Sequence, residues 1–152
     1  MAKKRSKADG RISNRRARYD YELGDSITVG IQLTGAETKA LRSGQGKLTG
    51  SYVTVKKDEL WLVGAFIGST NAVKVPEADQ RRDRKLLAHR SEIKRLIEAK
   101  NQGRTILPLD ILTTGRYLKL KISAGKGLKR YDKREILKRR QQERDIERRV
   151  RL

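Results

Sequence analysis

The sequence predicts a mainly β protein with helices, folded as an antiparallel β-barrel of about six strands. Three observations support this prediction. Runs rich in β-branched residues alternate apolar with polar positions, short polar turns join these runs in pairs, and one helical segment lies between strands while another precedes the last pair. A chain of 152 residues buries one core, so a single domain with tails is expected.

The charge of the chain predicts a polyanionic partner. Lysine and arginine number 38 against 18 acidic residues, which gives a formal net charge of +20. This excess is far larger than solubility requires. Nucleic acid is therefore the favoured partner, ahead of an acidic membrane surface or no partner at all.

Residues 1–12 are predicted to be a flexible basic arm. Basic residues dominate the chain up to Arg18, where Asp9 is the one acid, and almost nothing there could be buried. Ordered structure is expected from near Tyr19. Residues 13–130 form the predicted barrel domain, and residues 131–152 form the basic C-terminal tail.

The first predicted strand covers residues 27–33. Ile27, Val29, Ile31 and Leu33 alternate with polar or small residues, as expected for a strand with one buried face. One side of this strand should therefore belong to the core.

A short helix of about two turns follows the strand. Thr34 and Glu37 have the spacing of a capping box, in which each side chain accepts a hydrogen bond from the other residue's amide. Gly44 is placed to end the helix.

The next predicted unit is a hairpin. Residues 51–55 and 59–67 are β-branched and aromatic runs joined by a polar turn at residues 56–58. Residues 68–84 lack a sustained period and contain Pro76, so a long surface loop is expected.

The second helix covers residues 89–103 and begins at a cap formed by His89 or Ser91. The apolar residues Ile93, Leu96 and Ile97 share one face of this helix, and the other face is charged.

A second hairpin, residues 104–112 and 116–124, completes the domain. Pro108 favours an edge or a bulge. The alternation predicts that Leu118, Leu120 and Ile122 point inward and that Lys119, Lys121 and Ser123 point outward. This order of elements suits an OB-like barrel with two to three α-helices.

The C-terminal tail carries dense charge without an apolar face. Leu137 and Ile146 fall on opposite sides of a helix, so no stripe is available for docking. The tail is therefore predicted to be disordered when free and to fold on RNA, and the alternative is a permanently helical, solvated spacer. Tyr131, surrounded by basic residues, is suited to stacking on an unpaired base.

The sequence offers no catalytic or cofactor site. There is no cysteine, His89 is the one histidine, and the glycine-rich stretch SAGKGLKR lacks the Ser or Thr that a P-loop needs after Lys126. The carboxylates are interleaved with basic residues as surface ion pairs are. We therefore expect no enzyme activity, no cofactor and no metal.

No membrane association is expected either, because the chain has neither an apolar secretion signal nor a continuous apolar run long enough to span a bilayer. A cytoplasmic location follows as an expectation.

Six motifs in order, NRRARYDY, LTGAETKALRSG, SYV, ELWL, RKLLAH and YDKRE, resemble those of the SsrA-binding protein family, also called small protein B. The resemblance covers residues 13–144. It implies an OB-like barrel that binds transfer-messenger RNA (tmRNA, SsrA RNA) and brings it to stalled ribosomes for trans-translation, without catalysis. It further implies a tail that becomes helical in the empty messenger channel, a monomer, and elongation factor Tu and alanyl-tRNA synthetase as partners through tmRNA.

The resemblance also implies two sets of binding residues. The expected tmRNA contacts are Asn14, Arg16, Arg18, Lys85 and Leu87. The expected ribosome contacts, at 16S rRNA of the decoding centre and the messenger channel, are Gly127, Lys129, Tyr131, Asp132, Lys133, Arg134, Lys138 and Arg139. The chain departs from the family pattern at Thr28, Leu128 and residues 68–84.

Two other classes of function fit a small basic chain. One is a structural ribosomal-type protein bound to ribosomal RNA, and the other is an enzyme acting on RNA. The enzyme would need clustered carboxylates, a metal pair or a cofactor loop, none of which the sequence contains.

Overall fold

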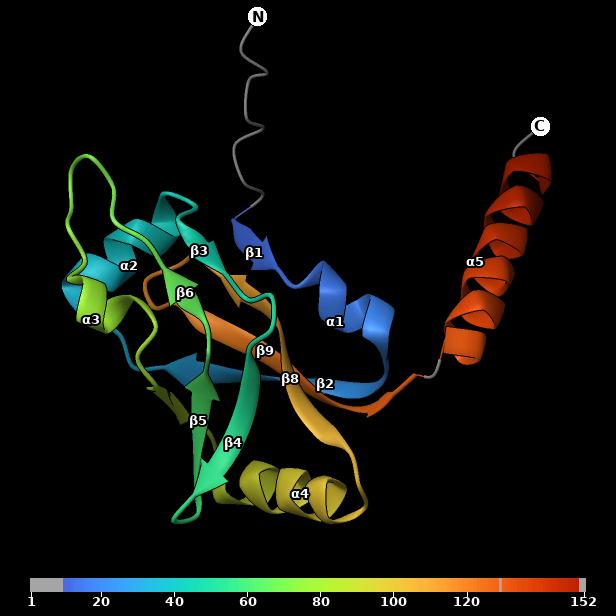
Figure 1. Ribbon diagram of the computed structural model, residues 1–152, viewed down its shortest axis with the longest axis horizontal. Coiled ribbons are helices and arrows are strands. Elements are labelled where there is room, and N and C mark those ends of the chain that lie inside the picture. Colours follow the sequence, from blue (N-terminus) through green and yellow to red (C-terminus); the bar gives the residue numbers. More distant parts are fainter. Residues whose placement is uncertain (1–9, 129, 151–152) are drawn as a thin grey trace, which may run out of the picture.

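A closed ring of six antiparallel strands forms the body of the protein (Figure 1). The computed structural model describes residues 10–128 and 130–150. The ring runs β8-β4-β5-β7-β2-β9, and pairing of β9 with β8 closes it, while β1 adds to the outer edge of β8. These strands are β1 (Arg11–Ser13), β2 (Tyr21–Ile31), β4 (Tyr52–Lys56), β5 (Glu59–Val63), β7 (Arg84–Leu87), β8 (Thr105–Leu112) and β9 (Lys119–Gly127).

Helices cover parts of the barrel, and the C-terminal helix projects away from it (Figure 1). The helices are α1 (Arg15–Asp20), α2 (Gly35–Arg42), α3 (Glu77–Gln80), α4 (Arg90–Asn101) and α5 (Arg130–Val150). A separate two-stranded sheet joins β3 (Gly46–Lys47) to β6 (Phe66–Ile67) near α2. The fold is therefore the predicted mainly β, barrel-like architecture, with more helices than expected.

The core fills the inside of the ring. The apolar residues of alternating strand positions, such as Leu60, Leu86, Leu120 and Ile122, are buried together with Leu96 of α4. A smaller apolar cluster lies outside the ring, where Ala17 of α1 packs on Leu107 and Leu109 of β8. Burial of both clusters is the main driving force for this arrangement.

Several local predictions are confirmed. Thr34 and Glu37 form the capping box of α2, and Gly44 after it has a φ of +82°. Lys57 and Asp58, at the turn between β4 and β5, also have positive φ, as a two-residue hairpin turn requires. The register between β8 and β9 shifts between Pro108 and Asp110, so Pro108 occupies a bulge, one of the two settings expected for it.

Other local predictions are wrong. Structure begins before Tyr19, because Arg11 and Ile12, which the sequence placed in the arm, pair with β8. The loop predicted for residues 68–84 contains α3 and ends at Arg84, the buried first residue of β7. Ser123, which was expected to face outward to solvent, is buried at a bulge of β2, where its hydroxyl donates to the carbonyl of Gly24 at 3.0 Å.

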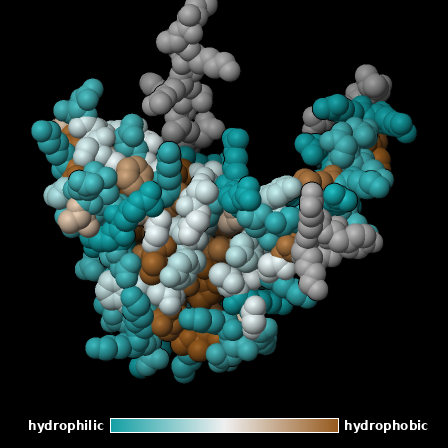
Figure 2. Space-filling view, viewed as in Figure 1, coloured by the Kyte–Doolittle hydropathy of each residue, from teal (hydrophilic) through white to brown (hydrophobic). Residues whose placement is uncertain are grey.

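Most apolar side chains of α5 are exposed, and Ile136 at its base is the half-buried one among those described. Leu137, Ile146 and Val150 are all exposed, and Figure 2 shows mainly hydrophilic residues over this helix. That the tail is disordered in the free protein and folds on RNA stays a prediction. Within the described residues, no helix is long and apolar enough to cross a membrane.

Candidate nucleic-acid interface

The first candidate surface is formed by α1, which begins at Asn14. The Asn14 side chain accepts from the amide of Ala17 at 3.2 Å and donates to the carbonyls of Leu48 and Pro108 at 3.3 and 2.9 Å. These bonds satisfy an otherwise free amide of the helix and hold the helix start on the barrel. Asn14 is only 2% exposed, so its side chain serves the interior of the protein.

The three arginines of α1, Arg15, Arg16 and Arg18, are exposed, and two of them form ion pairs. Arg18 donates to Oδ2 of Asp110 at 2.8 Å, and Arg16 donates to Oδ2 of Asp20 at the same distance. Arg16 also lies over the ring of Tyr19, 5.9 Å from its centroid. Both arginines keep exposed donors, because each carboxylate engages one edge of a guanidinium that has five N–H groups.

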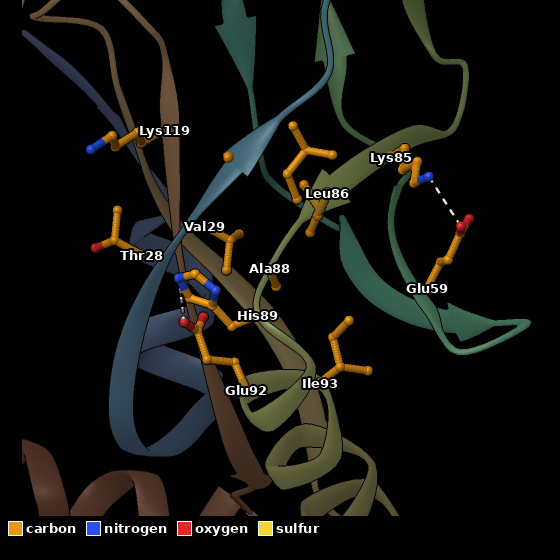
Figure 3. A pocket seen from close by; sticks show the side chains of 12 residues that line it. Thr28, Val29, Glu59, Lys85, Leu86, Ala88, His89, Glu92, Ile93 and Lys119 are labelled. Carbon is orange, nitrogen blue, oxygen red and sulfur yellow. Dashed lines mark ion pairs between the residues drawn. The ribbon is translucent and has the colours of Figure 1, made fainter.

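The second candidate surface is a groove of about 610 Å³ between β2, β7 and the start of α4 (Figure 3). Strand alternation decides which β7 residues reach it: Arg84 and Leu86 point inward, so Lys85 and Leu87 point outward. Leu87 is 53% exposed, which is unusual for an apolar residue in the middle of a sheet. Lys85 pairs with Glu59 at 3.0 Å.

A buried ion pair between Arg84 of β7 and Glu37 of α2 holds the start of β7 in place. Arg84 donates through Nε to Glu37 of α2, and its other nitrogens donate to the carbonyls of Ala65, Asp79, Gln80 and Arg82. All of its donor groups are thereby used inside the protein. The network ties α2, α3 and β7 into one unit behind the groove.

Glu37 remains ionised in this setting. Burial raises the pKa of its carboxyl, but hydrogen bonds from Arg82, Arg84 and the amide of Thr34 outweigh burial and leave the pKa below its ordinary value. Burial is also the main cause that lowers the pKa of Arg84, and Glu37 opposes it. The pair is therefore charged near neutral pH, and each charge compensates the other.

The third candidate surface is the junction of the barrel with α5. Lys133 donates to Oδ1 of Asp20 at 2.9 Å and lies over the ring of Tyr19, 5.5 Å from its centroid. The hydrogen bond from Lys133 is the largest cause of the lowered pKa of Asp20, and Arg16 adds to it against the opposing effect of burial. Tyr19 thus has two cations close to its ring, and 41% of its surface is exposed.

The remaining predicted ribosome contacts lie around this junction. Gly127 ends β9 opposite Tyr21, Tyr131 and Asp132 belong to the first turn of α5, and Lys129 lies outside the described residues. Farther along α5, three exposed basic side chains point to solvent: Arg134, Lys138 and Arg139.

The structure brings some predicted residues together and separates others. Arg16 and Lys133 meet at Asp20, while Lys85 and Leu87 share the groove. Tyr19 was not among the predicted contacts, and its place in the basic motif NRRARYDY was a signal for an exposed aromatic. Among the described residues, no group of three His, Cys, Asp or Glu could hold a metal ion.

Comparison with known proteins gives consistent matches. The sequence profile of the SmpB protein family matches residues 11–152. The SsrA-binding protein of Trichormus variabilis is 45% identical over 137 residues, covering 89% of this chain and 88% of that relative. The SsrA-binding protein of Ligilactobacillus salivarius is 39% identical over 149 residues, covering 97% and 96%.

A solved structure is also similar. It is described as "tmRNA-SmpB: a journey to the center of the bacterial ribosome", and it superposes with a TM-score of 0.67 at 36% sequence identity. The similarity covers 84% of this chain and 94% of the other.

Proposed function

The chain belongs to the SmpB protein family, and from this membership we propose that it binds transfer-messenger RNA and delivers it to stalled ribosomes for trans-translation. The family relatives are SsrA-binding proteins, and the similar solved structure concerns tmRNA, SmpB and the ribosome. The net charge of +20 supports a polyanionic partner of this kind.

The exposure of Leu87 is the structural observation that carries the proposal. A rigid strand holds this apolar side chain in solvent beside Lys85, above a buried network that keeps β7 in place. Such a pair can pack on an exposed base and neutralise the adjoining phosphate. A site of this kind needs no catalytic group, and no enzyme activity is proposed.

The α1 surface is proposed as a second tmRNA contact. Arg16 and Arg18 would position phosphates, since their guanidinium groups keep exposed donors. Asn14 has a different proposed role from the direct contact expected from the sequence. Because it is buried and holds the start of α1, it would position the two arginines.

The tail is proposed to act on the ribosome. We infer contacts with 16S rRNA at the decoding centre and in the messenger channel, which is empty on a stalled ribosome. An exposed cationic helix without an apolar face supports this proposal, because RNA phosphates can stabilise it where a protein core cannot. The proposed contacts are Gly127, Lys129, Tyr131, Asp132, Lys133, Arg134, Lys138 and Arg139.

The tail is further proposed to be disordered in the free protein and to gain its helix in the channel. Intact messenger would then exclude it, which would restrict delivery to stalled ribosomes. Elongation factor Tu and alanyl-tRNA synthetase would act on the same complex through tmRNA. The proposed location is the cytoplasm, and the proposed free form is a monomer.

Purification of the tagged full-length protein from bacterial cells, followed by sequencing of the bound RNA, tests the proposal. We expect strong enrichment of tmRNA over other RNAs, and sedimentation of a small protein fraction with ribosomes. Recovery of ribosomal RNA without tmRNA, with the protein present on every ribosome, would instead establish a structural ribosomal protein.

A further inference from the structure

An acidic residue of β8 lies almost completely buried beneath the α1 surface. We propose that Asp110 is a positioning residue for RNA recognition, which holds the guanidinium of Arg18 in one orientation and so makes α1 favour tmRNA over other RNA. This inference rests on the proposed function and extends it, because Asp110 belongs to none of the motifs that indicated RNA contacts.

A bulge in β8 brings Asp110 under α1. Ile111 belongs to the core inside the ring, so strand alternation places Asp110 on the outer face. The preceding residue, Leu109, also lies outside the ring, where it packs with Ala17 of α1. The register shift between Pro108 and Asp110 thus lets two consecutive residues of β8 face the same helix.

The carboxylate of Asp110 is buried, whereas the arginine that pairs with it is not. The Asp110 side chain is 3% exposed and the Arg18 side chain is 45% exposed, and Nη2 of Arg18 lies 2.8 Å from Oδ2 of Asp110. A buried carboxylate without a cation is strongly unfavourable, so the pair restrains the bonded edge of the guanidinium. Because the group is planar, its remaining donors then face away from the barrel in a fixed direction.

The other two arginines of α1 lack such a restraint. Arg16 pairs with Asp20, which belongs to the same helix and is partly exposed. The ion pairs of the described residues do not involve Arg15. Arg18 is therefore the arginine of α1 whose direction is set by a strand of the barrel, 92 positions away in the sequence.

A fixed guanidinium distinguishes between RNAs. Ordering a long side chain opposes binding, and Asp110 orders Arg18 before RNA arrives, which helps an RNA whose phosphate meets the free edge. The same carboxylate places negative charge beneath the surface, which weakens attraction for phosphates that do not meet that edge. Asp110 should therefore strengthen binding of an RNA that fits α1 and weaken binding of RNA in general.

Binding of full-length variants to a tmRNA transcript and to an unrelated hairpin RNA of the same length tests the inference. Asp110→Asn keeps the shape of the side chain and removes its charge. Release of one long side chain should lower tmRNA affinity by about two- to tenfold, although the net charge becomes more positive. Affinity for the unrelated RNA should not fall. Glu98→Gln, on the exposed face of α4, removes the same charge as a control and should leave the ratio of the two affinities unchanged.

A double-mutant cycle with Arg18 makes the outcome independent of folding defects. In an Arg18→Gln background, Asp110→Asn should no longer lower tmRNA affinity, because the group that Asp110 positions is absent. A folding defect would lower the affinity in both backgrounds. The inference is overturned if Asp110→Asn binds tmRNA as tightly as wild-type protein, if both RNAs lose affinity by the same factor, or if the loss persists without Arg18. Absence of tmRNA binding by the wild-type protein would overturn the proposed function itself.

Discussion

Nζ of Lys133 lies 2.9 Å from Oδ1 of Asp20, so the first turn of α5 is attached to the end of α1. The other oxygen of the same carboxylate accepts from Arg16 at 2.8 Å. One acidic side chain therefore joins α1, the proposed RNA surface, to the C-terminal helix. This ion pair is one of the contacts that hold the base of α5 next to the barrel.

Replacement of Asp20 by Asn should loosen the base of α5. In the complex of the protein with tmRNA and a stalled ribosome, where the tail is proposed to be helical, hydrogen exchange of the backbone amides of residues 133–140 should become faster, because the ion pairs with Lys133 and Arg16 are lost. Asp145→Asn, which alters a carboxylate far along the helix, is the control. Equal exchange rates in Asp20→Asn and wild-type protein would show that the junction does not hold the helix.

Replacement of Glu37 by Gln should destabilise the whole barrel. The change leaves the buried charge of Arg84 without its partner, so the free energy of unfolding should fall by about 3–5 kcal/mol. Urea unfolding measures this effect. As a control, Asp83→Asn removes the exposed pair with Lys56 and should cost about 0–1 kcal/mol. A similar small cost for Glu37→Gln would refute a structural role of the pair.

The Glu37 carboxyl also predicts a specific response to acid. Its pKa is lowered in the folded protein, so its contribution to stability is fully present above its unfolded pKa of about 4.5 and is lost as the pH falls through the lower, folded value. The gap in stability between wild-type protein and Glu37→Gln should therefore narrow in acid. Unfolding curves at a series of pH values test this, and a constant gap would contradict it.

Replacement of Leu87 by Ala should weaken RNA binding without unfolding the protein. Loss of apolar contact with a base should cost about 1–2 kcal/mol of binding free energy. The exposed position implies a change of about 0.5 kcal/mol or less in stability. Its buried neighbour is the control: Leu86→Ala should lose about 2–5 kcal/mol of stability. Unchanged tmRNA affinity of Leu87→Ala in a filter-binding assay would exclude Leu87 from the interface.

Ending the chain after Tyr131 should separate the two proposed activities, which are tmRNA binding by the barrel and the action of the tail on the ribosome. The barrel and α1 remain, so affinity for tmRNA should stay within a few-fold of the wild-type value. Tagging of peptides on stalled ribosomes should be abolished in a reconstituted translation assay. Removal of residues 151–152 alone is the control. Normal tagging by the shortened chain would show that α5 has no function on the ribosome.

Local patterns in the sequence were sufficient to predict most elements of the barrel. The capping box of Thr34 and Glu37, the turn at residues 56–58 and the bulge at Pro108 depend on neighbours within a few positions, and the structure contains each of them. The alternation in β2 and β9 likewise reflects burial of one face, which a single strand reveals.

The predictions that failed depend on distant partners. Arg84 has the sequence appearance of a solvated charge, and only the folded chain supplies Glu37 and the carbonyls that permit its burial. Ser123 is buried because a bulge in β2 brings the carbonyl of Gly24 to its hydroxyl. The burial of Asn14 depends on distant partners in the same way, because the Leu48 and Pro108 carbonyls that hold it are far away in the sequence, and its contact with tmRNA stays a prediction.

The closed ring constrains how the chain can fold while it is being synthesised. Ser123 and Gly24, which are bonded across β9 and β2, are 99 positions apart, and Asn14 and Pro108 are 94 apart. During synthesis, the early strands therefore leave the exit tunnel long before their partners exist, and such long-range pairing is slow to form. A nascent chain released before β9 would retain unpaired strand edges, which favour aggregation and proteolysis over a partly working product.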